Sequence, residues 1–152
     1  MTSDLTCRPA HASERQALED LQRRASLANP NDRDALLSHP EAIELPLDQI
    51  LAGHVFVAER DGETVGFATV LPRDDGNSEL DALFVEPSCW KQGCGRVLIE
   101  HCAAIARTRG SAALHVIGNP HAEGFYRACG FDQIGMIDTR FGVGLLFKRS
   151  LS

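Results

Sequence analysis

The sequence contains 152 residues, of which 43% are hydrophobic and 24% charged, as is usual for a soluble globular domain. Its formal net charge of −6 argues against a nucleic-acid partner, and it has no run of 18 apolar residues that could span a membrane. The first ten residues lack the basic and then apolar layout of a secretory signal, so we expect a cytoplasmic protein.

A short strand and two helices are expected at the start of the chain. Residues 5–10 have the composition of a strand, and Ser13 and Gln16 have the spacing of a capping box at a helix start. The helix that follows would bury one face, formed by Leu18, Leu21 and Ala25. Asp32 is in position to cap a second, shorter helix, and residues 39–51 are interpreted as a variable connection with a weakly helical end.

The middle of the chain is rich in strand-forming residues. Residues 54–60 and 64–72 predict two strands joined by a hairpin turn at Asp61-Gly62, and residues 78–87 predict a third strand. Such an order favours an antiparallel meander. It leads directly into a loop that contains two glycines.

The second half of the chain predicts alternating helices and strands. A helix is expected from about residue 95 to 108, ended by Gly110, and a strand over residues 112–118. A short helix over residues 121–130 and two strands within residues 131–151 complete the order. Because no repeat or linker interrupts the pattern, we expect one mixed α/β domain over residues 1–152.

The five cysteines form no CxxC pair and no cluster with histidines at the spacing of zinc ligands. We therefore expect free thiols, with neither a disulfide framework nor a metal site.

Gly93 and Gly95 lie where the third strand of the meander gives way to a helix. A helix begins with backbone N–H groups that lack intrahelical partners and with the positive end of its dipole, so a glycine loop there lets those donors approach an anion. The N–H groups of residues 92–97 could bind a phosphate, with Lys91 and Arg96 adding positive charge. The alternative is that the glycines only ease a tight turn.

A second motif follows the next strand. At fixed offsets it holds Asn119, Ala122, Phe125, Tyr126, Gly130 and Phe131. Together with residues 83–99, this motif makes the chain resemble the GNAT superfamily of acyl-CoA N-acyltransferases. The signatures of that family are a (Gln/Arg)-x-x-Gly-x-(Gly/Ala) loop that opens a helix, and a downstream Asn-x-x-Ala-x-x-Phe-Tyr followed by Gly-Phe. The resemblance covers about residues 54–131, with one departure: Trp90 stands where Gln or Arg is usual.

The resemblance implies a mostly antiparallel central sheet flanked by about four helices, with acetyl-CoA or another acyl-CoA in a splay between two strands and no metal. The pantetheine arm would pair with the backbone of Leu83, Phe84 and Val85, much as an added strand would. The other cofactor-binding residues that it implies are Lys91, Gln92, Gly93, Cys94, Gly95, Arg96 and Val97 in the loop, and Asn119, Ala122, Phe125 and Tyr126 in the second motif.

Transfer of an acyl group from a thioester to an amine requires a neutral amine, a donor for the developing oxyanion and a proton or hydrogen bond for the leaving thiolate. Tyr126, the only tyrosine of the chain, fits the last role in the family pattern. Its alternative role is packing, which we assign instead to Phe125 and Phe131. A covalent route through Cys94, whose thiol would lie at a helix N-terminus, is a further alternative.

Glu79 and Asp81 are the candidate general bases. Strand alternation places both side chains on one face with Leu83, and a carboxylate on this strand resembles the base position of some family members. Either carboxylate could instead be a solvated surface charge, and a water relay could replace a dedicated base.

The expected reaction is direct transfer of an acetyl group from acetyl-CoA to a small-molecule or peptide amine, and a homodimer is compatible with the family. Two alternatives belong to other classes of protein. One is a degenerate acyl-CoA-binding sensor or partner module, which Trp90 favours. The other, a nucleotide-binding or phosphotransfer enzyme, is disfavoured because the chain has neither GxxxxGK[ST] nor GxGxxG.

Overall fold

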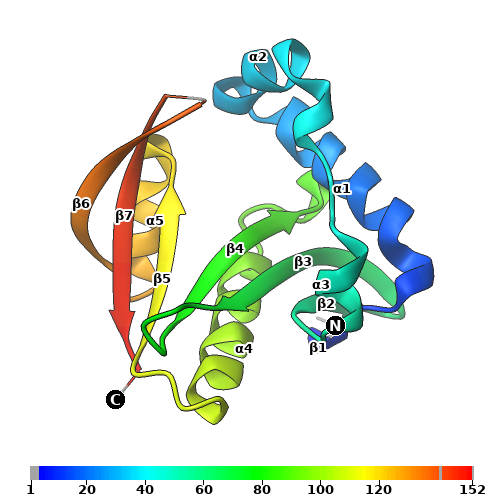
Figure 1. Cartoon of the computed structure of the whole chain (residues 1–152). Helices are drawn as coiled ribbons and strands as arrows, with labels where there is room; N and C mark the ends of the chain where they lie inside the picture. Colours follow the sequence, from blue (N-terminus) through cyan, green and yellow to red (C-terminus); the bar gives the residue numbers. More distant parts are fainter. Residues whose placement is uncertain (1–3, 141, 152) are drawn as a thin grey trace. The chain divides into compact units, whose positions relative to one another are not determined.

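The computed structural model describes residues 4–140 and 142–151, and within them it contains seven strands and five α-helices (Figure 1). The strands are β1 (Thr6–Pro9), β2 (Val55–Arg60), β3 (Glu63–Pro72), β4 (Ser78–Val85), β5 (Ala113–Gly118), β6 (Asp132–Thr139) and β7 (Gly142–Ser150). The helices are α1 (Arg15–Ala28), α2 (Pro30–Ser38), α3 (Leu47–Leu51), α4 (Cys94–Thr108) and α5 (Glu123–Ala128). The mixed α/β class is confirmed. The helix beyond the expected four is α3, which forms the weakly helical end of the connection after α2.

The strands form one sheet in the order β1-β2-β3-β4-β5-β7-β6. The pairs β1–β2, β2–β3, β5–β7 and β6–β7 are antiparallel, so the sheet is mostly antiparallel as expected. Strands β4 and β5 are parallel, with Ser78–Leu80 paired with residues 114–116. Both strands continue past this short ladder, β4 to Val85 and β5 to Gly118.

The chain divides into two compact units, one formed by residues 1–69 and 82–98 and the other by residues 70–81 and 99–152. Strands β3 and β4 and helix α4 each contribute to both. We describe each unit by itself. That the whole chain forms a single domain stays a prediction.

The core of the first unit forms between α1 and the strands β2 and β3 (Figure 1). Leu18 and Leu21 of α1 are buried against Val57 and Phe67, as the helical periodicity predicted. The predicted hairpin between β2 and β3 is also confirmed. Its two turn residues, Asp61 and Gly62, have φ angles of 55° and 79°, and a two-residue turn needs this left-handed conformation to match the strand twist.

The start of α1 differs from the predicted capping box. A 3-10 turn (Ala12–Glu14) precedes the helix, and the N–H of His11 donates to the carboxylate of Glu14 at 2.8 Å. Glu14 also accepts two hydrogen bonds of 2.8 Å from the guanidinium of Arg8 in β1. Ser13 therefore lies inside the turn, and a contact with a strand, which sequence spacing does not reveal, decides where the helix begins.

The start of α2 also differs from its prediction. The helix begins at Pro30, so Asp32 lies inside its first turn rather than at the cap. Proline suits the first helical position because its missing N–H would have no partner there.

Glu14 should make the stability of the protein depend on pH in the acidic range. The hydrogen bond from Arg8 lowers the pKa of Glu14 from its usual 4.5 to about 2. A lowered carboxyl pKa contributes stability that is present above the unfolded-state value and is lost as the pH falls towards the folded-state value. We expect Glu14→Gln to lower the free energy of unfolding by about 2 kcal/mol at pH 7, less than the full pKa shift implies because the pair is partly exposed.

Urea unfolding of wild type and Glu14→Gln at several pH values measures this effect. The difference between them should shrink as the pH falls from about 4.5 towards 2. The control is Asp20→Asn, because Asp20 pairs with Arg23 at 3.4 Å on the exposed surface of α1 and should contribute little. A difference that stays constant with pH would contradict the role of the Arg8 contact.

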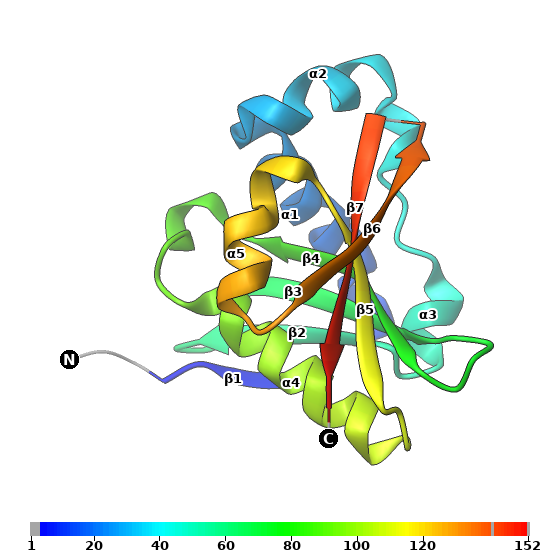
Figure 2. The same cartoon turned by 90° about the vertical axis from the view of Figure 1, so that its left-hand side faces the viewer.

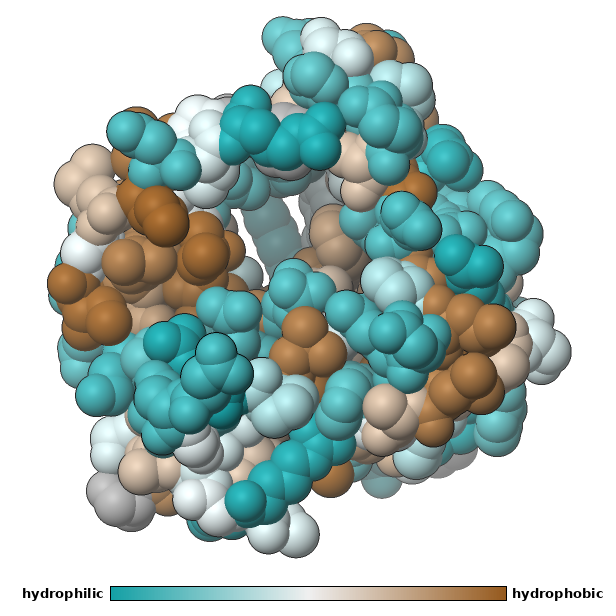
Figure 3. Space-filling view, viewed as in Figure 1, coloured by the Kyte–Doolittle hydropathy of each residue, from teal (hydrophilic) through white to brown (hydrophobic). Residues whose placement is uncertain are grey.

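The second unit places α5 along one face of β5, β7 and β6 (Figure 2). Its most buried large side chains include Phe131 and Phe147, both within 1% of complete burial. On the outer side of this unit, Figure 3 shows hydrophobic surface where β6 and β7 lie in Figure 1. The exposed apolar residues of these two strands are Ile134, Met136, Ile137 and Val143.

Candidate functional site

The loop between β4 and α4, predicted to bind phosphate, contains two residues with left-handed backbone. A 3-10 turn (Pro87–Cys89) follows β4, and Lys91 and Gly93 then adopt left-handed conformations with φ angles of 63° and 84°. Helix α4 begins at Cys94, and its first turn closes through the N–H of Val97, which donates to the carbonyl of Gly93 at 3.1 Å. Of the two loop glycines, position 93 is thus the one at which the left-handed backbone favours glycine. Gly95 lies inside the first turn of the helix.

The geometry of this loop suits an anion. A helix as long as α4 carries partial positive charge at its first turn, where the leading N–H groups lack intrahelical acceptors. Lys91 and Arg96 are exposed beside that turn and bring two positive charges. All of the predicted loop residues, from Lys91 to Val97, therefore belong to one short segment whose charge and backbone favour phosphate.

Cys94 does not have the features of an activated nucleophile. Its side chain is 1% exposed, and burial raises the pKa of its thiol. A nucleophilic cysteine needs a lowered pKa and access to substrate. The structure thus disfavours the covalent route and leaves Cys94 with its backbone amide as its contribution to the loop.

Trp90 occupies the loop position where the family pattern has Gln or Arg. Its indole N–H donates to the carbonyl of Val85 at 2.8 Å, and its side chain is 40% exposed. The tryptophan therefore ties the loop back to the end of β4. This contact uses one of the two lone pairs on the Val85 carbonyl, which the sequence analysis assigned to the pantetheine arm.

The rest of β4 follows the predicted alternation. Ala82 and Phe84 pack against the core of the first unit, whereas Asp81 is exposed. Phe84 therefore offers its backbone rather than its side chain to a ligand. Leu83 is partly buried.

Gln92 has a fixed side chain that the sequence did not suggest. Its amide oxygen accepts a hydrogen bond of 2.7 Å from Arg60 of β2, and its amide nitrogen donates to the carbonyl of Ser88 at 3.1 Å. Arg60 lies 32 residues away in the sequence, so only the pairing of the strands brings it to the loop.

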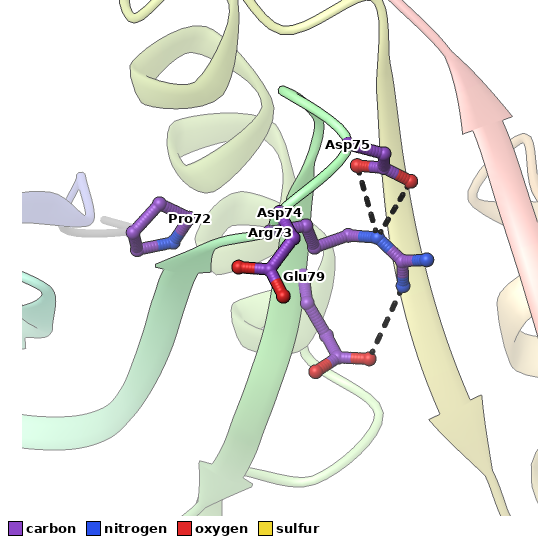
Figure 4. Close-up of a pocket in the computed structure, with 5 residues that line it drawn as sticks. All are labelled: Pro72, Arg73, Asp74, Asp75 and Glu79. Carbon is purple, nitrogen blue, oxygen red and sulfur yellow. Dashed lines mark hydrogen bonds and ion pairs between the residues drawn. The ribbon is translucent and has the colours of Figure 1, made fainter.

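The two candidate bases lie in the second unit, near an arginine that the sequence analysis did not single out. Arg73 follows β3 and lies 3.6 Å from the carboxylate of Glu79, and it also contacts Asp75 at 3.2 Å (Figure 4). Burial raises the pKa of both Glu79 and Asp81, and for Glu79 the charge of Arg73 opposes the rise. A raised pKa moves a carboxylate towards the range where a base can accept a proton near neutral pH.

Glu79 lines an open pocket of about 400 Å³. Figure 4 shows the side chains that line it. The other residues that line it are Pro72, Arg73, Asp74 and Asp75. Because Arg73 holds both Asp75 and Glu79, these carboxylates are partly neutralised within the protein. Among residues 4–140 and 142–151, Asp81 forms no ion pair, and partial burial is the cause of its raised pKa.

The second motif begins at the end of β5 and runs through α5. Asn119 is exposed and precedes a 3-10 turn (Pro120–Ala122), and its carbonyl accepts from the N–H of Ala122 at 2.9 Å. This turn leads directly into α5, on which Phe125 is 39% exposed. The packing role assigned to Phe125 is therefore only partly filled, because much of its ring remains outside the core.

Tyr126 packs against the buried rings of Phe131 and Phe147. Its ring centroid lies 5.7 Å from that of Phe131 and 5.3 Å from that of Phe147. Burial raises the pKa of its phenol to about 12, so the hydroxyl keeps its proton at neutral pH. Among residues 4–140 and 142–151, no group is hydrogen-bonded to that hydroxyl, which leaves its proton available to a ligand.

Gly118 is required for this position of Tyr126. A Cβ atom at Gly118 would lie 2.7 Å from the ring of Tyr126 and 3.1 Å from that of Phe147. Gly118→Ala should therefore displace one of the rings and lower the free energy of unfolding by about 1–3 kcal/mol, as overpacking does in other cores. Thermal or urea denaturation measures the loss.

Gly124→Ala is the matched control, because a Cβ atom there would meet nothing within 4 Å. Gly124 lies in the first turn of α5, so that substitution should leave the free energy of unfolding unchanged or raise it slightly. Wild-type stability in Gly118→Ala would mean that the aromatic cluster adjusts freely and that Tyr126 is not held in place.

The model of the acetyltransferase (GNAT) family matches residues 16–131, which is more than half of the chain. The chain belongs to the GNAT family. This agrees with the resemblance seen in the two sequence motifs, and the match extends from α1 to the end of the second motif. Both signature segments of this GNAT chain thus lie inside the matched region.

Two curated relatives are similar to parts of this GNAT chain. Phosphinothricin N-acetyltransferase of Alcaligenes faecalis is 35% identical over 103 residues, which are 61% of this chain and 50% of that protein. Serotonin N-acetyltransferase 2, chloroplastic, of Oryza sativa subsp. japonica is 34% identical over 89 residues, which are 59% of this chain and 42% of that protein. The matched segments therefore span about half the length of these relatives or less.

Among solved structures, the GNAT chain is similar to an N-acetyltransferase, PaiA, of Thermoplasma acidophilum in complex with coenzyme A. The TM-score is 0.76 at 16% identity, and the match covers 97% of this chain and 99% of that one. At this identity the likeness establishes the fold.

Within residues 4–140 and 142–151, no helix combines the length and the apolar character that crossing a membrane requires. The same part of the chain contains no group of three or more His, Cys, Asp or Glu side chains arranged to hold a metal ion.

Proposed function

We propose that this chain transfers an acetyl group from acetyl-CoA to a primary amine by direct attack in a ternary complex. The observation that carries the proposal is the loop from Lys91 to Val97. It combines a left-handed Gly93, the N-terminus of a 15-residue helix and two exposed cationic side chains, in a chain that belongs to the GNAT family. These features suit the pyrophosphate of coenzyme A.

The remaining cofactor contacts follow the family pattern. The backbone of Leu83, Phe84 and Val85 would pair with the pantetheine arm, and the carbonyl of Val85 would share its acceptor capacity with Trp90. From the second motif, Asn119, Ala122, Phe125 and Tyr126 would contact the cofactor. Exposed Asn119 and Phe125 are compatible with ligand contacts.

Tyr126 would act on the leaving thiolate. A thiol has a reference pKa of about 8.5, well below the raised pKa of the Tyr126 phenol, so complete proton transfer from tyrosine to thiolate is uphill. A hydrogen bond from the phenol to the thiolate avoids this cost and still stabilises the charge that develops on sulfur. We therefore assign Tyr126 as a hydrogen-bond donor that lowers the barrier to thiolate departure.

Asp81 and Glu79 are the proposed bases that deprotonate the amine, directly or through water. Asp81 is the stronger candidate because Arg73 already neutralises part of the charge of Glu79. If one carboxylate is the base, its neutral amide should lower kcat at least tenfold and remove the acidic limb of the pH–rate profile. Because burial raises both pKa values, that limb in wild type should lie above the usual carboxyl range.

Asp81→Asn and Glu79→Gln test the two candidates separately. The control is Asp74→Asn, which removes a carboxylate from the same pocket without touching β4. A wild-type pH profile in both strand variants would discard the carboxylate base in favour of a water relay.

The acceptor is proposed only as a small-molecule or peptide amine. The two curated relatives carry names that include small amines, phosphinothricin and serotonin. The formal charge of −6 suits a cationic or neutral acceptor better than nucleic acid. A homodimer stays a prediction, and light scattering at several concentrations would test it.

A catalytically degenerate acyl-CoA-binding module is the second candidate. Trp90 favours it, because the side chain of this residue bonds to Val85 and supplies no positive charge to the loop. Such a module would bind CoA and show no turnover with any amine.

The test of the proposed function is acetyl-CoA turnover, followed as free thiol release, with a panel of amines, amino acids and peptides. CoA affinity is measured in parallel by calorimetry. Thiol release that depends on the amine supports the transferase. Tight CoA binding with no turnover supports the sensor module, and no CoA binding overturns both.

A further inference from the structure

Arg60 lacks the carboxylate partner that many arginines of this structure have. Arg8, Arg24, Arg73, Arg127 and Arg149 each contact at least one carboxylate. Arg60, at the end of β2, has no carboxylate within ion-pair distance among residues 4–140 and 142–151, and its Nε atom is buried without a hydrogen-bond partner. A partly buried cation with no counter-charge is costly unless an anion lies nearby in the working protein.

The partner that Arg60 does have belongs to the phosphate loop. Its Nη1 atom donates to the amide oxygen of Gln92 at 2.7 Å, and the amide nitrogen of Gln92 donates to the carbonyl of Ser88 at 3.1 Å. The guanidinium also lies close enough to the thiol of Cys94 to oppose the rise of its pKa. Arg60 thus contacts the loop just before α4 and lies near the first residue of the helix.

Two consequences follow from these contacts. The chain Arg60–Gln92–Ser88 spans the turn that contains Lys91, a non-glycine residue with a φ angle of 63°. Backbone in this conformation persists only where its surroundings hold it, and the hydrogen bonds of Gln92 do so. The second consequence is electrostatic, because the charge of Arg60 remains uncompensated beside the N-terminus of α4, where it adds to the field that attracts an anion.

We propose that Arg60 is a positioning residue of the phosphate loop, which holds Gln92 in place and lends its charge to a diphosphate bound at the start of α4. In this way β2 supplies the positive charge that Trp90 does not. The proposal rests on the proposed function, because it requires that the loop binds the diphosphate of coenzyme A.

The test measures the Kd of CoA for wild type and four variants by calorimetry, with the melting temperature of each unliganded protein. Arg60→Met should weaken CoA binding about tenfold, because it removes the charge and releases Gln92. Arg60→Lys keeps the charge and should recover most of that loss. Gln92→Leu should also weaken binding. The Kd of the double variant Arg60→Met/Gln92→Leu should lie within about twofold of the higher Kd of the two single variants, since both substitutions remove the same contact.

Arg23→Met is the matched control. It removes the same charge from the exposed face of α1 and should leave the Kd of CoA unchanged, because Asp20 is the one ion-pair partner of Arg23 among residues 4–140 and 142–151. The dependence of the Kd on ionic strength is a second measurement, which would not differ between the variants if Arg60 had a purely structural role. The difference between wild type and Arg60→Met should narrow between about 0.05 M and 1 M salt, because screening removes the contribution of the Arg60 charge.

The outcomes separate this inference from the proposed function. If wild type fails to bind CoA, the proposed function fails and the inference fails with it. If wild type binds CoA and Arg60→Met binds it equally well, or if losses in the single variants simply add, the role of Arg60 is wrong while the transferase proposal stands. If Arg60→Met weakens CoA binding and Arg60→Lys weakens it equally, the charge of Arg60 does not contribute to binding, and the electrostatic part of the proposal is overturned.

Discussion

Tyr126→Phe should lower kcat about a hundredfold and leave the Kd of CoA within about twofold of wild type. The expected size follows from the contribution that a positioned proton or hydrogen-bond donor makes to a transition state, roughly 10²–10⁴ in rate. The substitution removes only the hydroxyl and keeps the ring between Phe131 and Phe147. Since that hydroxyl has no partner among the described residues, its removal should not change the free energy of unfolding by more than a few tenths of a kcal/mol.

The loss should depend on the leaving group. A thioester whose thiol is more acidic releases a more stable thiolate, which needs less help from a hydrogen bond. The ratio of wild-type to Tyr126→Phe rates should therefore fall with an acyl donor activated in this way. Arg127→Gln is the control on the same helix. Within the described part of the chain, the Arg127 side chain pairs with Glu123 alone, on the surface, so the substitution should leave kcat unchanged.

Two results would contradict this role. An unchanged kcat in Tyr126→Phe removes the phenol from the chemistry and leaves Tyr126 as a packing residue. A fall in kcat together with an equal rise in the Kd of CoA would instead mean that the hydroxyl binds the cofactor in the ground state.

Much of the fold could be predicted because its signals are local. The buried face of α1 repeats at the helical period, and the Asp61-Gly62 turn has the two residues that tolerate left-handed backbone. The phosphate loop is also local, since Gly93 and the start of α4 are neighbours in the sequence. In each case one short segment holds all the information that the local structure needs.

Three features that the sequence did not predict depend on distant residues. The cap of α1 is set by Arg8 of β1, which draws Glu14 into place and leaves Ser13 without that role. Arg60 reaches Gln92 across 32 residues, and the need for glycine at position 118 comes from the ring of Tyr126. Such contacts exist only once the strands have paired, so neither composition nor spacing could reveal them.

The candidate site illustrates the same limit. The family match covers both motifs and confirms that the chain belongs to GNAT, whereas the roles of the site residues stay predictions. The motifs assigned packing to Phe125 and chemistry to Tyr126, but they could not predict which of the two rings would be more buried, because both suit a helix that packs on a sheet. The structure buries Tyr126 more deeply than Phe125, so the residue proposed for chemistry also packs against the core side chains of Phe131 and Phe147.

Gly93→Ala should weaken CoA binding about tenfold, whereas Gly53→Ala should leave it unchanged. The two glycines form a matched pair within the same unit. Their φ angles are 84° and 79°, and a Cβ atom at either position would meet nothing within 4 Å. An alanine therefore introduces the same backbone strain at both, about 1 kcal/mol, and no steric clash at either.

Gly93 and Gly53 differ in the structure that depends on their left-handed backbone. Gly93 accepts the hydrogen bond that closes the first turn of α4, so relaxation of its φ angle would turn the leading N–H groups away from a bound phosphate. Gly53 follows α3 and belongs to no predicted site. Equal losses of stability with unequal losses of CoA affinity would therefore assign the difference to anion binding rather than to folding.

Gly93→Asp extends the argument from geometry to charge. Besides the same backbone strain, this substitution adds a carboxylate beside the first turn of α4. The positive field there attracts anions, and the added negative charge would weaken it and repel a bound diphosphate. We expect the Kd of CoA to rise about a hundredfold, and the part of the loss that exceeds Gly93→Ala to shrink as salt screens the added charge. If Gly93→Asp and Gly53→Asp bind CoA equally well, the loop does not hold the diphosphate, and the two glycines serve only the turn between strand and helix.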